Sequence, residues 1–192
     1  MDLLARLRTE TRGAHHALED DLGLSGRLTS PERYEEVLAV FLGFHEPLEE
    51  ALAAAVTAQR LPWSVLPGAG LLAADLRDSG WSPARIASLP RSATPDVESL
   101  PALVGSLYVV EGARLGGQLI TRWVAGALGP VPVSFFAGDG DARRRLRRFG
   151  ELAGQVLPPQ DVPAACAAAN RHFELFRDWV VASDHRAAPS AR

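Results

Sequence analysis

Apolar side chains recur every three or four positions along most of the chain, the spacing of one buried helix face. Strand-like alternation bounded by Asn-Gly or Asp-Gly turns is absent. The periodic segments predict helices over 2–20, 30–59, 70–78, 82–88, 98–128, 141–157 and 161–183. The sequence therefore predicts an all-α fold with a single domain.

Proline and glycine mark the ends of these segments. Ser30-Pro31 and Ser82-Pro83 each place a capping hydroxyl before a proline in the first helical turn. Pro47 lies inside the second helix and is expected to bend it, because it removes one backbone hydrogen bond. We expect the domain to span 1–186 and the remaining residues, 187–192, to form a frayed tail.

The composition is that of an ordinary globular protein. Of the 192 residues, 47% are hydrophobic and 22% are charged, which suits one domain with a sizeable core. The formal net charge of −3 indicates no nucleic-acid partner. Five arginines between Arg143 and Arg148 are interpreted as a solvated helix face, since no aromatic residues alternate with them.

No membrane or disulfide chemistry is expected. Cys166 is the single cysteine and lies among alanines, where a thiol behaves as a small hydrophobe. The most apolar long segment, 102–128, contains Glu111, Arg114 and Arg122, so it is unsuited to crossing a membrane. The first residues lack the continuous apolar region of a signal peptide. We therefore expect a cytoplasmic location.

The first helix carries a candidate ligand face. Arg8, Arg12, His15 and Glu19 fall within a sector of roughly 60° beside the apolar stripe, at about 100° per residue. A neutral imidazole can ligate iron through one nitrogen while a carboxylate one turn away accepts the proton of the other. The two arginines could face carboxylates of a ligand. An ordinary surface pair between His15 and Glu19 is the alternative.

The helix over 98–128 is unusually rich in glycine. Gly105, Gly112, Gly116 and Gly117 each cost a helix interior about 1 kcal/mol relative to alanine, so they need a reason. One explanation is a flat ligand lying against bare backbone, since Gly105, Gly112 and Gly116 share a face. The other is close packing between helices. The sequence alone leaves both open.

Two segments resemble the bacterial haem oxygenases. Residues 107–118 (LYVVEGARLGGQ) resemble the distal-helix motif of that family, and residues 12–19 (RGAHHALE) resemble its proximal-helix motif. Residues 28–34 (LTSPERY) and 173–179 (FELFRDW) are similar as well, so the resemblance spans most of the chain in order. It is strongest to the group that supplies biliverdin to bacterial phytochromes. The resemblance implies a helical bundle with haem between the first helix and a kinked, glycine-rich helix.

The resemblance assigns roles to the residues that match these motifs. His15 matches the proximal iron ligand and Glu19 its hydrogen-bond partner. The distal glycines that let the helix cross the haem face match Gly112, Gly116 and Gly117.

Further residues are candidates for holding the haem propionates. Arg8 and Tyr108 match propionate contacts, and basic character adds Arg12 and Arg177. Mammalian-type relatives place an aspartate where this chain has Ala113. His45, on the second helix, is interpreted as a buried structural histidine.

The implied reaction opens the haem ring to biliverdin, carbon monoxide and iron. Haem is then both substrate and cofactor, and molecular oxygen is consumed. Electrons are expected from a ferredoxin or a flavoprotein reductase, because the sequence has no nucleotide-binding glycine loop after a strand. A bacteriophytochrome is a possible recipient of the biliverdin.

Two alternatives remain at this point. One is a haem carrier or sensor that uses the same pocket without turnover. The other is a thiaminase-like hydrolase on a related helical fold, which would need an activated cysteine in a polar pocket. Cys166, in its alanine-rich segment, is a poor candidate for that nucleophile.

Overall fold

The computed structural model describes residues 2–138 and 140–187, and these contain helices and no strand, which confirms the all-α prediction. The described elements, in chain order, are α1 (Leu3–Leu22), α2 (Leu24–Arg27), α3 (Pro31–Ala58), α4 (Gly68–Asp78), α5 (Pro83–Ala87), α6 (Leu100–Leu128), α7 (Ser134–Ala137), α8 (Ala142–Val156), the 3-10 turn η1 (Pro159–Asp161) and α9 (Val162–Ala187). The tail predicted over 187–192 lies outside the described residues, apart from Ala187, which ends α9.

Capping serines begin three of the helices. The hydroxyl oxygens of Ser30, Ser82 and Ser99 each accept a hydrogen bond from the backbone N–H three residues on, at 3.2–3.3 Å. The two Ser-Pro starts are therefore confirmed. Helix α3 continues through Pro47. The short helices α2 and α7 were not predicted, because four residues are too few to show a hydrophobic period.

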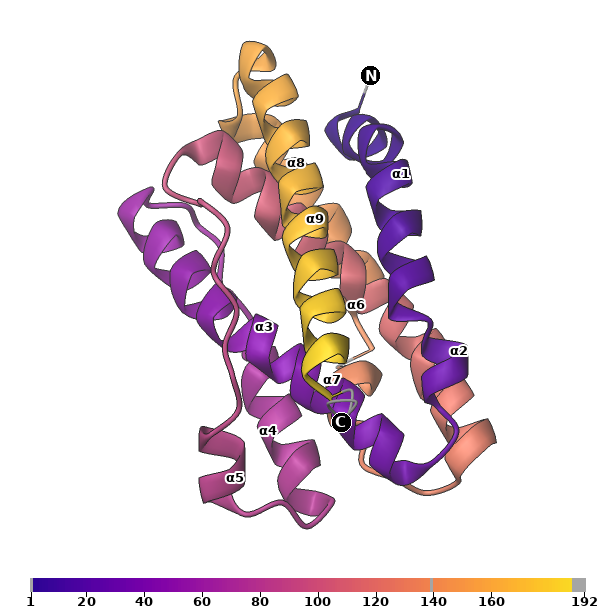
Figure 1. Cartoon of the computed structure of the whole chain (residues 1–192). Coiled ribbons are helices and arrows are strands. Elements are labelled where there is room, and N and C mark those ends of the chain that lie inside the picture. Colours follow the sequence, from indigo (N-terminus) through magenta and orange to yellow (C-terminus); the bar gives the residue numbers. More distant parts are fainter. Residues whose placement is uncertain (1, 139, 188–192) are drawn as a thin grey trace.

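Helix α6 is the centre of the bundle. It packs against α9, α8, α7 and α3, while α1 packs against α9 and α8 (Figure 1). The buried core joins these elements through large apolar side chains that are almost fully shielded from solvent. They include Leu7, Leu38, Leu42, Phe44, Leu103, Leu107 and Phe149. No described helix is long and apolar enough to cross a membrane.

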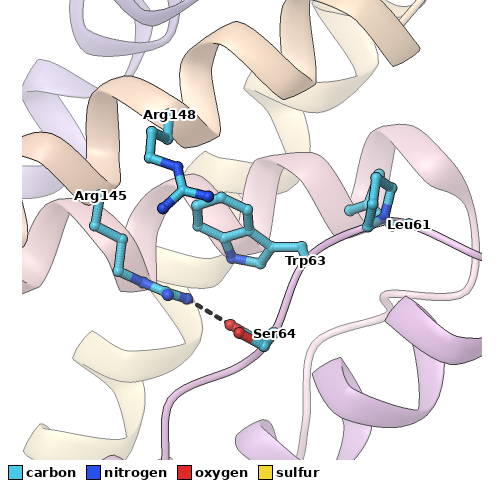
Figure 2. A pocket seen from close by; sticks show the side chains of 6 residues that line it. Leu61, Trp63, Ser64, Arg145 and Arg148 are labelled. Carbon is cyan, nitrogen blue, oxygen red and sulfur yellow. Dashed lines mark hydrogen bonds between the residues drawn. The ribbon is translucent and has the colours of Figure 1, made fainter.

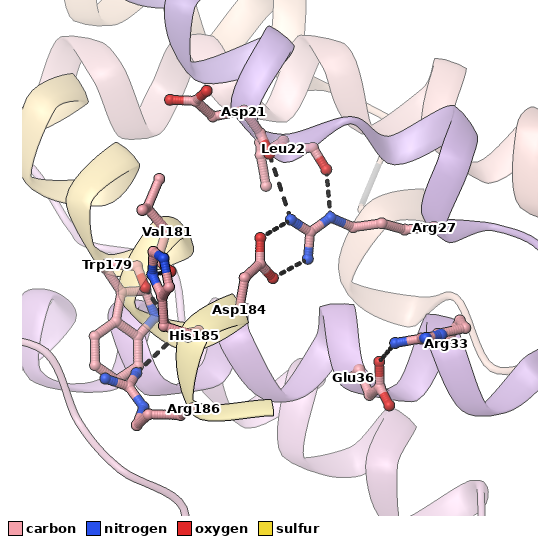
Figure 3. Close-up of polar contacts among 11 residues, drawn as sticks. Asp21, Leu22, Arg27, Arg33, Glu36, Trp179, Val181, Asp184, His185 and Arg186 are labelled. Carbon is pink, nitrogen blue, oxygen red and sulfur yellow. Dashed lines mark hydrogen bonds and ion pairs between the residues drawn. The ribbon is translucent and has the colours of Figure 1, made fainter. Parts of the chain in front are cut away.

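Arg27 ties the end of α1 to α9 (Figure 3). Its guanidinium donates to the carboxylate of Asp184 on α9, at 2.7 Å from Nη1 to Oδ1, and to the backbone carbonyl of Leu22, at 2.6 Å. A planar fork suits this simultaneous contact with a carboxylate and with carbonyls at the end of a helix. The contact joins the chain just after α1 to the C-terminal part of α9.

A second polar anchor places α7. Buried Asp75 on α4 accepts hydrogen bonds from the backbone N–H groups of Ser134 and Phe135, at 2.9 and 3.0 Å. The first N–H groups of a helix have no partner within it, so a carboxylate there satisfies them and favours the helix dipole. Asp75 thereby presents Phe135 and Phe136 to the interior.

Candidate functional site

A cavity of about 890 Å³ opens between α1, α3, α6, α7 and α9. Its volume lies in the range of sites that bind cofactors and small molecules. Apolar and aromatic side chains line most of it. Most of the polar side chains come from α1, and α3, α6 and α9 contribute the others: His45, Glu49, Tyr108, Arg114, Gln118 and His172. Of the residues predicted to form the site, those of the first helix and of the glycine-rich helix meet here.

The α1 wall carries His15. Its Nδ1 atom lies 3.2 Å from Oε2 of Glu19, one helical turn on, and the ring meets the edge of Phe173 at a centroid distance of 5.6 Å. Because the carboxylate engages Nδ1, it favours the tautomer that leaves Nε2 free to ligate a metal. The side chain of His15 is 50% exposed and lines the cavity, so the imidazole ring can be reached by a ligand there.

Two cations flank His15 on the same wall. Arg8 and Arg12 both line the cavity and are exposed. Within residues 2–138 and 140–187, neither forms an ion pair, whereas neighbouring Arg6 pairs with Glu10 at 2.9 Å. Unpaired guanidinium groups at the rim of an apolar cavity suit a ligand that carries carboxylates.

His15 also belongs to a group of side chains that could together hold a metal ion. The ligand atoms of His15, His16 and Glu19 lie within 4.8 Å of one another, and all three side chains are exposed. An iron that is already held by a macrocycle needs only one of these groups as its protein ligand.

The α6 wall is bare where Gly112 and Gly116 lie. A Cβ atom added at either glycine would meet nothing within 4 Å, so these positions open onto the cavity. Leu115, Leu119 and Trp123 line the same cavity and are 36–46% exposed. Large apolar side chains gathered in this way mark a ligand surface. Bare backbone beside them suits a flat, apolar ligand.

Gly105 and Gly117 have a different role. A Cβ on Gly105 would collide with the carbonyl oxygen of Ala165 and lie 2.9 Å from the amide nitrogen of Ala169, both on α9. A Cβ on Gly117 would collide with the carbonyl oxygen of Phe136 on α7. Of the two explanations that the sequence left open, close helix packing holds for Gly105, because that glycine lets α6 and α9 approach closely.

A buried ion pair holds α6 next to the open glycines. Glu111, 2% exposed, accepts hydrogen bonds from Arg145 of α8, at 2.7 Å from Nε, and from the indole N–H of Trp63, at 3.1 Å. Figure 2 shows Arg145 and Trp63 beside a smaller pocket of about 440 Å³, where Arg145 also reaches the Ser64 carbonyl. The arginine run is thus only partly a solvated face, since Arg145 is held inside.

Of Tyr108, Arg177 and Cys166, which the sequence also singled out, one lines the cavity and the others lie outside it. Tyr108 lines the cavity from α6 and is half-buried. Arg177 is absent from the cavity wall, and its guanidinium pairs with Asp21, which raises the pKa of Arg177 further. The structure therefore does not bring Arg177 to the other candidate ligand contacts. Cys166 is buried away from the cavity, and burial raises the pKa of its thiol, which disfavours a nucleophilic thiolate.

Two histidines line the inner part of the cavity. His45 on α3 and His172 on α9 are 8% and 2% exposed, and both rings contact Phe44. Burial, with a smaller contribution from His45, lowers the pKa of His172 to about 3, so its imidazole is neutral. The sequence drew attention to His45 alone, because nothing in the spacing of the chain links it to His172.

Comparison with known proteins identifies the family. The family model described as "Heme oxygenase" matches residues 1–182, so the chain belongs to the haem oxygenase family and is an oxidoreductase of that class. The solved "Structure of Heme Oxygenase from Leptospira interrogans" is similar in fold, with a TM-score of 0.64 and 18% sequence identity, covering 94% of this chain and 98% of that one. No curated protein matches the chain.

The cavity fits the haem that this family degrades. A flat macrocycle needs an accessible imidazole, a wall without side chains and cations for its propionates. His15, the backbone at Gly112 and Gly116, and the guanidinium groups of Arg8 and Arg12 offer these in one cavity. The sequence predicted all five residues. It missed Glu111 and His172, because their contacts, with Arg145 and with Phe44, join residues that are far apart in the sequence.

Proposed function

We propose that this chain opens the haem ring to biliverdin, carbon monoxide and iron, with molecular oxygen and external electrons as co-reactants. The observation that carries the proposal is the pairing of His15 Nδ1 with Glu19 at 3.2 Å in a cavity whose α6 wall is bare at Gly112 and Gly116. One wall thus offers a metal ligand, and another offers space for a flat ring and oxygen.

His15 and Glu19 act as a unit on the iron side. When bound, haem supplies both the iron and the ring that is oxidised. His15 would hold the iron through Nε2, and Glu19, 3.2 Å from Nδ1, would accept the proton on that nitrogen and so raise the basicity of the imidazole. A neutral imidazole releases less electron density to the iron than a thiolate does, and so favours O–O cleavage less strongly. That difference suits a reaction directed at the ring itself.

Other residues orient the ring. Arg8 and Arg12 would pair with the propionates of a bound haem, and Tyr108, which lines the same cavity from α6, would add a hydroxyl to them. Gly112 and Gly116 keep the ring face free of side chains, while Gly117 seats α6 against α7 so that this bare backbone is correctly placed. Arg177 is left out of this proposal, since its guanidinium is held by Asp21 outside the cavity.

The electrons come from a separate protein, either a ferredoxin or a flavoprotein reductase. Such a donor is proposed because the nucleotide-binding glycine loop follows a strand, and residues 2–138 and 140–187 form helices and no strand. We also propose a cytoplasmic location and, for the biliverdin, a bacteriophytochrome as recipient.

The test is a visible spectrum of the purified protein mixed with haemin, followed in air after addition of ascorbate and catalase. We expect a sharp Soret band that decays into a broad red verdin band. A Soret band that persists when a ferredoxin reductase system replaces ascorbate would favour a carrier or sensor. If no Soret band forms, the haem site itself is wrong.

Matched variants locate the ligand. His15→Ala should abolish the spectrum of a histidine-ligated iron, whereas His16→Ala, one residue along the helix, should keep it. In Glu19→Gln, haem should still bind, but the iron–histidine stretch in the resonance Raman spectrum should move to lower frequency, because an amide is a weaker acceptor than a carboxylate. An unchanged stretch would exclude the proposed pairing.

A further inference from the structure

His16 has no part in the proposed function, yet it lies next to the two residues assigned to the iron. His15, His16 and Glu19 all line the cavity from α1, and all three are exposed. Each offers one ligand atom for a metal ion, and these atoms lie within 4.8 Å of one another. No other group of three or more such side chains in residues 2–138 and 140–187 comes as close together.

The helix and its neighbour α9 place these side chains. His15 and Glu19 are one turn apart, so they lie on the same face of α1. The ring of His16 meets the ring of His15 edge-on, at a centroid distance of 6.1 Å. Phe173 of α9 also contacts the His15 ring, at 5.6 Å, and so restricts its movement. One ligand is therefore held by packing, and two exposed side chains beside it can adjust to an ion.

Two imidazoles and one carboxylate form a donor set that suits zinc. Zn²⁺ binds histidine nitrogen and carboxylate oxygen at about 2.0–2.2 Å, and two histidines with one glutamate are a combination that zinc enzymes use, with a fourth position open. Two such donors on one tetrahedral ion lie about 3.4 Å apart. Nδ1 of His15 lies 3.2 Å from Oε2 of Glu19. A zinc ion can therefore take the place of the proton between these two atoms with little movement of either side chain.

The charges of α1 around the two histidines also favour a cation. Within one turn on either side of His15 and His16, the helix carries two acids, Glu19 and Asp20, and one base, Arg12. Asp20 lines the cavity one turn beyond His16 and is exposed. The two carboxylates outweigh the single guanidinium, so a divalent ion at this place meets a net negative charge on the helix.

We propose that His15, His16 and Glu19 bind Zn²⁺ in the haem-free protein, through Nδ1 of His15, and that this ion and haem exclude one another. A neutral imidazole has one nitrogen with a lone pair and one with a proton. When zinc occupies Nδ1, the proton is on Nε2, and that nitrogen cannot ligate iron. When Nε2 holds the iron, Nδ1 keeps its proton towards Glu19. The exclusion rests on the proposed role of His15 as the iron ligand.

Zinc titrations of the haem-free full chain test the site. Calorimetry with zinc chloride should show one ion bound per chain. His16→Ala removes one ligand but keeps His15 and Glu19, so zinc affinity should fall about tenfold or more, while haem affinity stays within about twofold of wild type. The control is His185→Ala on α9. His185 is exposed, with Nδ1 at 2.8 Å from the Val181 carbonyl oxygen, and its removal should leave zinc affinity unchanged.

Haem titrations at a fixed zinc concentration test the exclusion. With free Zn²⁺ at ten times its own Kd, the apparent Kd of the wild-type protein for haem should rise about elevenfold by mass action. The same zinc concentration should raise the haem Kd of His16→Ala by about twofold or less.

Two results would overturn the proposal. One is a zinc affinity that is equal in the wild-type protein and in His16→Ala, and the other is a haem affinity that does not depend on zinc. Failure of the wild-type protein to bind haem in the absence of zinc would instead reject the proposed function. The zinc titration of the haem-free protein would still decide whether the metal site exists.

Nuclear magnetic resonance of the histidine rings tests the nitrogen that is used. In haem-free protein labelled with ¹⁵N-histidine, long-range proton–nitrogen correlations report which nitrogen of His15 carries the proton. Without metal, the Glu19 contact favours a proton on Nδ1. Saturating zinc should leave the proton on Nε2. If zinc left the proton of His15 on Nδ1, the proposal would be overturned.

Discussion

Helix α6 contains two pairs of glycines that look alike in the sequence and act in opposite ways. Gly105 and Gly117 are buried where the helix touches α9 and α7, with no room for a Cβ atom. Gly112 and Gly116 face open space in the cavity, where a Cβ would touch nothing within 4 Å. The first pair lets the protein pack, and the second leaves room for what the protein binds.

The difference shows how one helix can serve as both core and ligand surface. Towards its beginning, α6 is buried almost continuously, from Ala102 to Leu107, against α9 and α3. Beyond Glu111 it exposes Leu115, Leu119 and Trp123 to the cavity. The ion pair of Glu111 with Arg145 lies at the change between the two parts. It anchors the helix where packing against its neighbours gives way to the open cavity.

The strongest test of the packed pair is Gly105→Ala. The new methyl group would press on backbone atoms of Ala165 and Ala169, which cannot move without shifting α9. Overpacking of this kind should lower the free energy of unfolding by about 3 kcal/mol, measured by urea denaturation. Gly154→Ala on exposed α8, with nothing within 4 Å, should instead be stabilising. Equal stability of the two variants would contradict the assignment of Gly105 to packing.

Glu111→Gln tests the anchor between the two parts. The amide keeps a hydrogen bond to Trp63 but loses the charge that Arg145 needs, in a place where Glu111 is 2% exposed. Hydrogen bonds to charged groups contribute about 1.5–3 kcal/mol, so we expect a loss near 2 kcal/mol in urea unfolding.

Glu151→Gln is the matched control for that variant. Glu151 pairs with Arg147 of the same helix at 4.0 Å, and both side chains are more than 60% exposed. Exposed pairs contribute little, so no measurable change in stability is expected. If the two substitutions had the same effect, the Glu111 pair would be no anchor.

Much of the architecture could be predicted from the sequence, and particular residues show which features could not. The Ser-Pro starts at residues 30 and 82 predicted helix beginnings correctly, because capping depends on near neighbours. The face of α1 bearing His15 followed from helical spacing. Whether a glycine is packed or open depends on a helix distant in sequence, so Gly105 and Gly112 could not be told apart.

A large side chain at Gly116 tests the pair of glycines that faces the cavity. Gly116→Leu puts a side chain into space that is empty within 4 Å and lines the cavity. We expect haem affinity, measured by Soret titration, to fall about tenfold, which corresponds to about 1.4 kcal/mol. Gly126→Leu is the control, since Gly126 is equally unobstructed on α6 but outside the cavity wall. Unchanged haem affinity in Gly116→Leu would place the ring elsewhere.

The smallest expected effect is also the most direct comparison with the packed pair. Gly112→Ala and Gly105→Ala each add one methyl group to the same helix. At Gly112, however, the new Cβ atom would meet nothing within 4 Å. The haem-free protein should gain about 0.5–1 kcal/mol in the free energy of unfolding, because alanine restricts the unfolded chain more than glycine does. Ala113→Gly, at the exposed next position, should lose a similar amount. If Gly112→Ala were destabilising, the backbone at that glycine would need a freedom that only glycine has, and the contrast between the two pairs would fail.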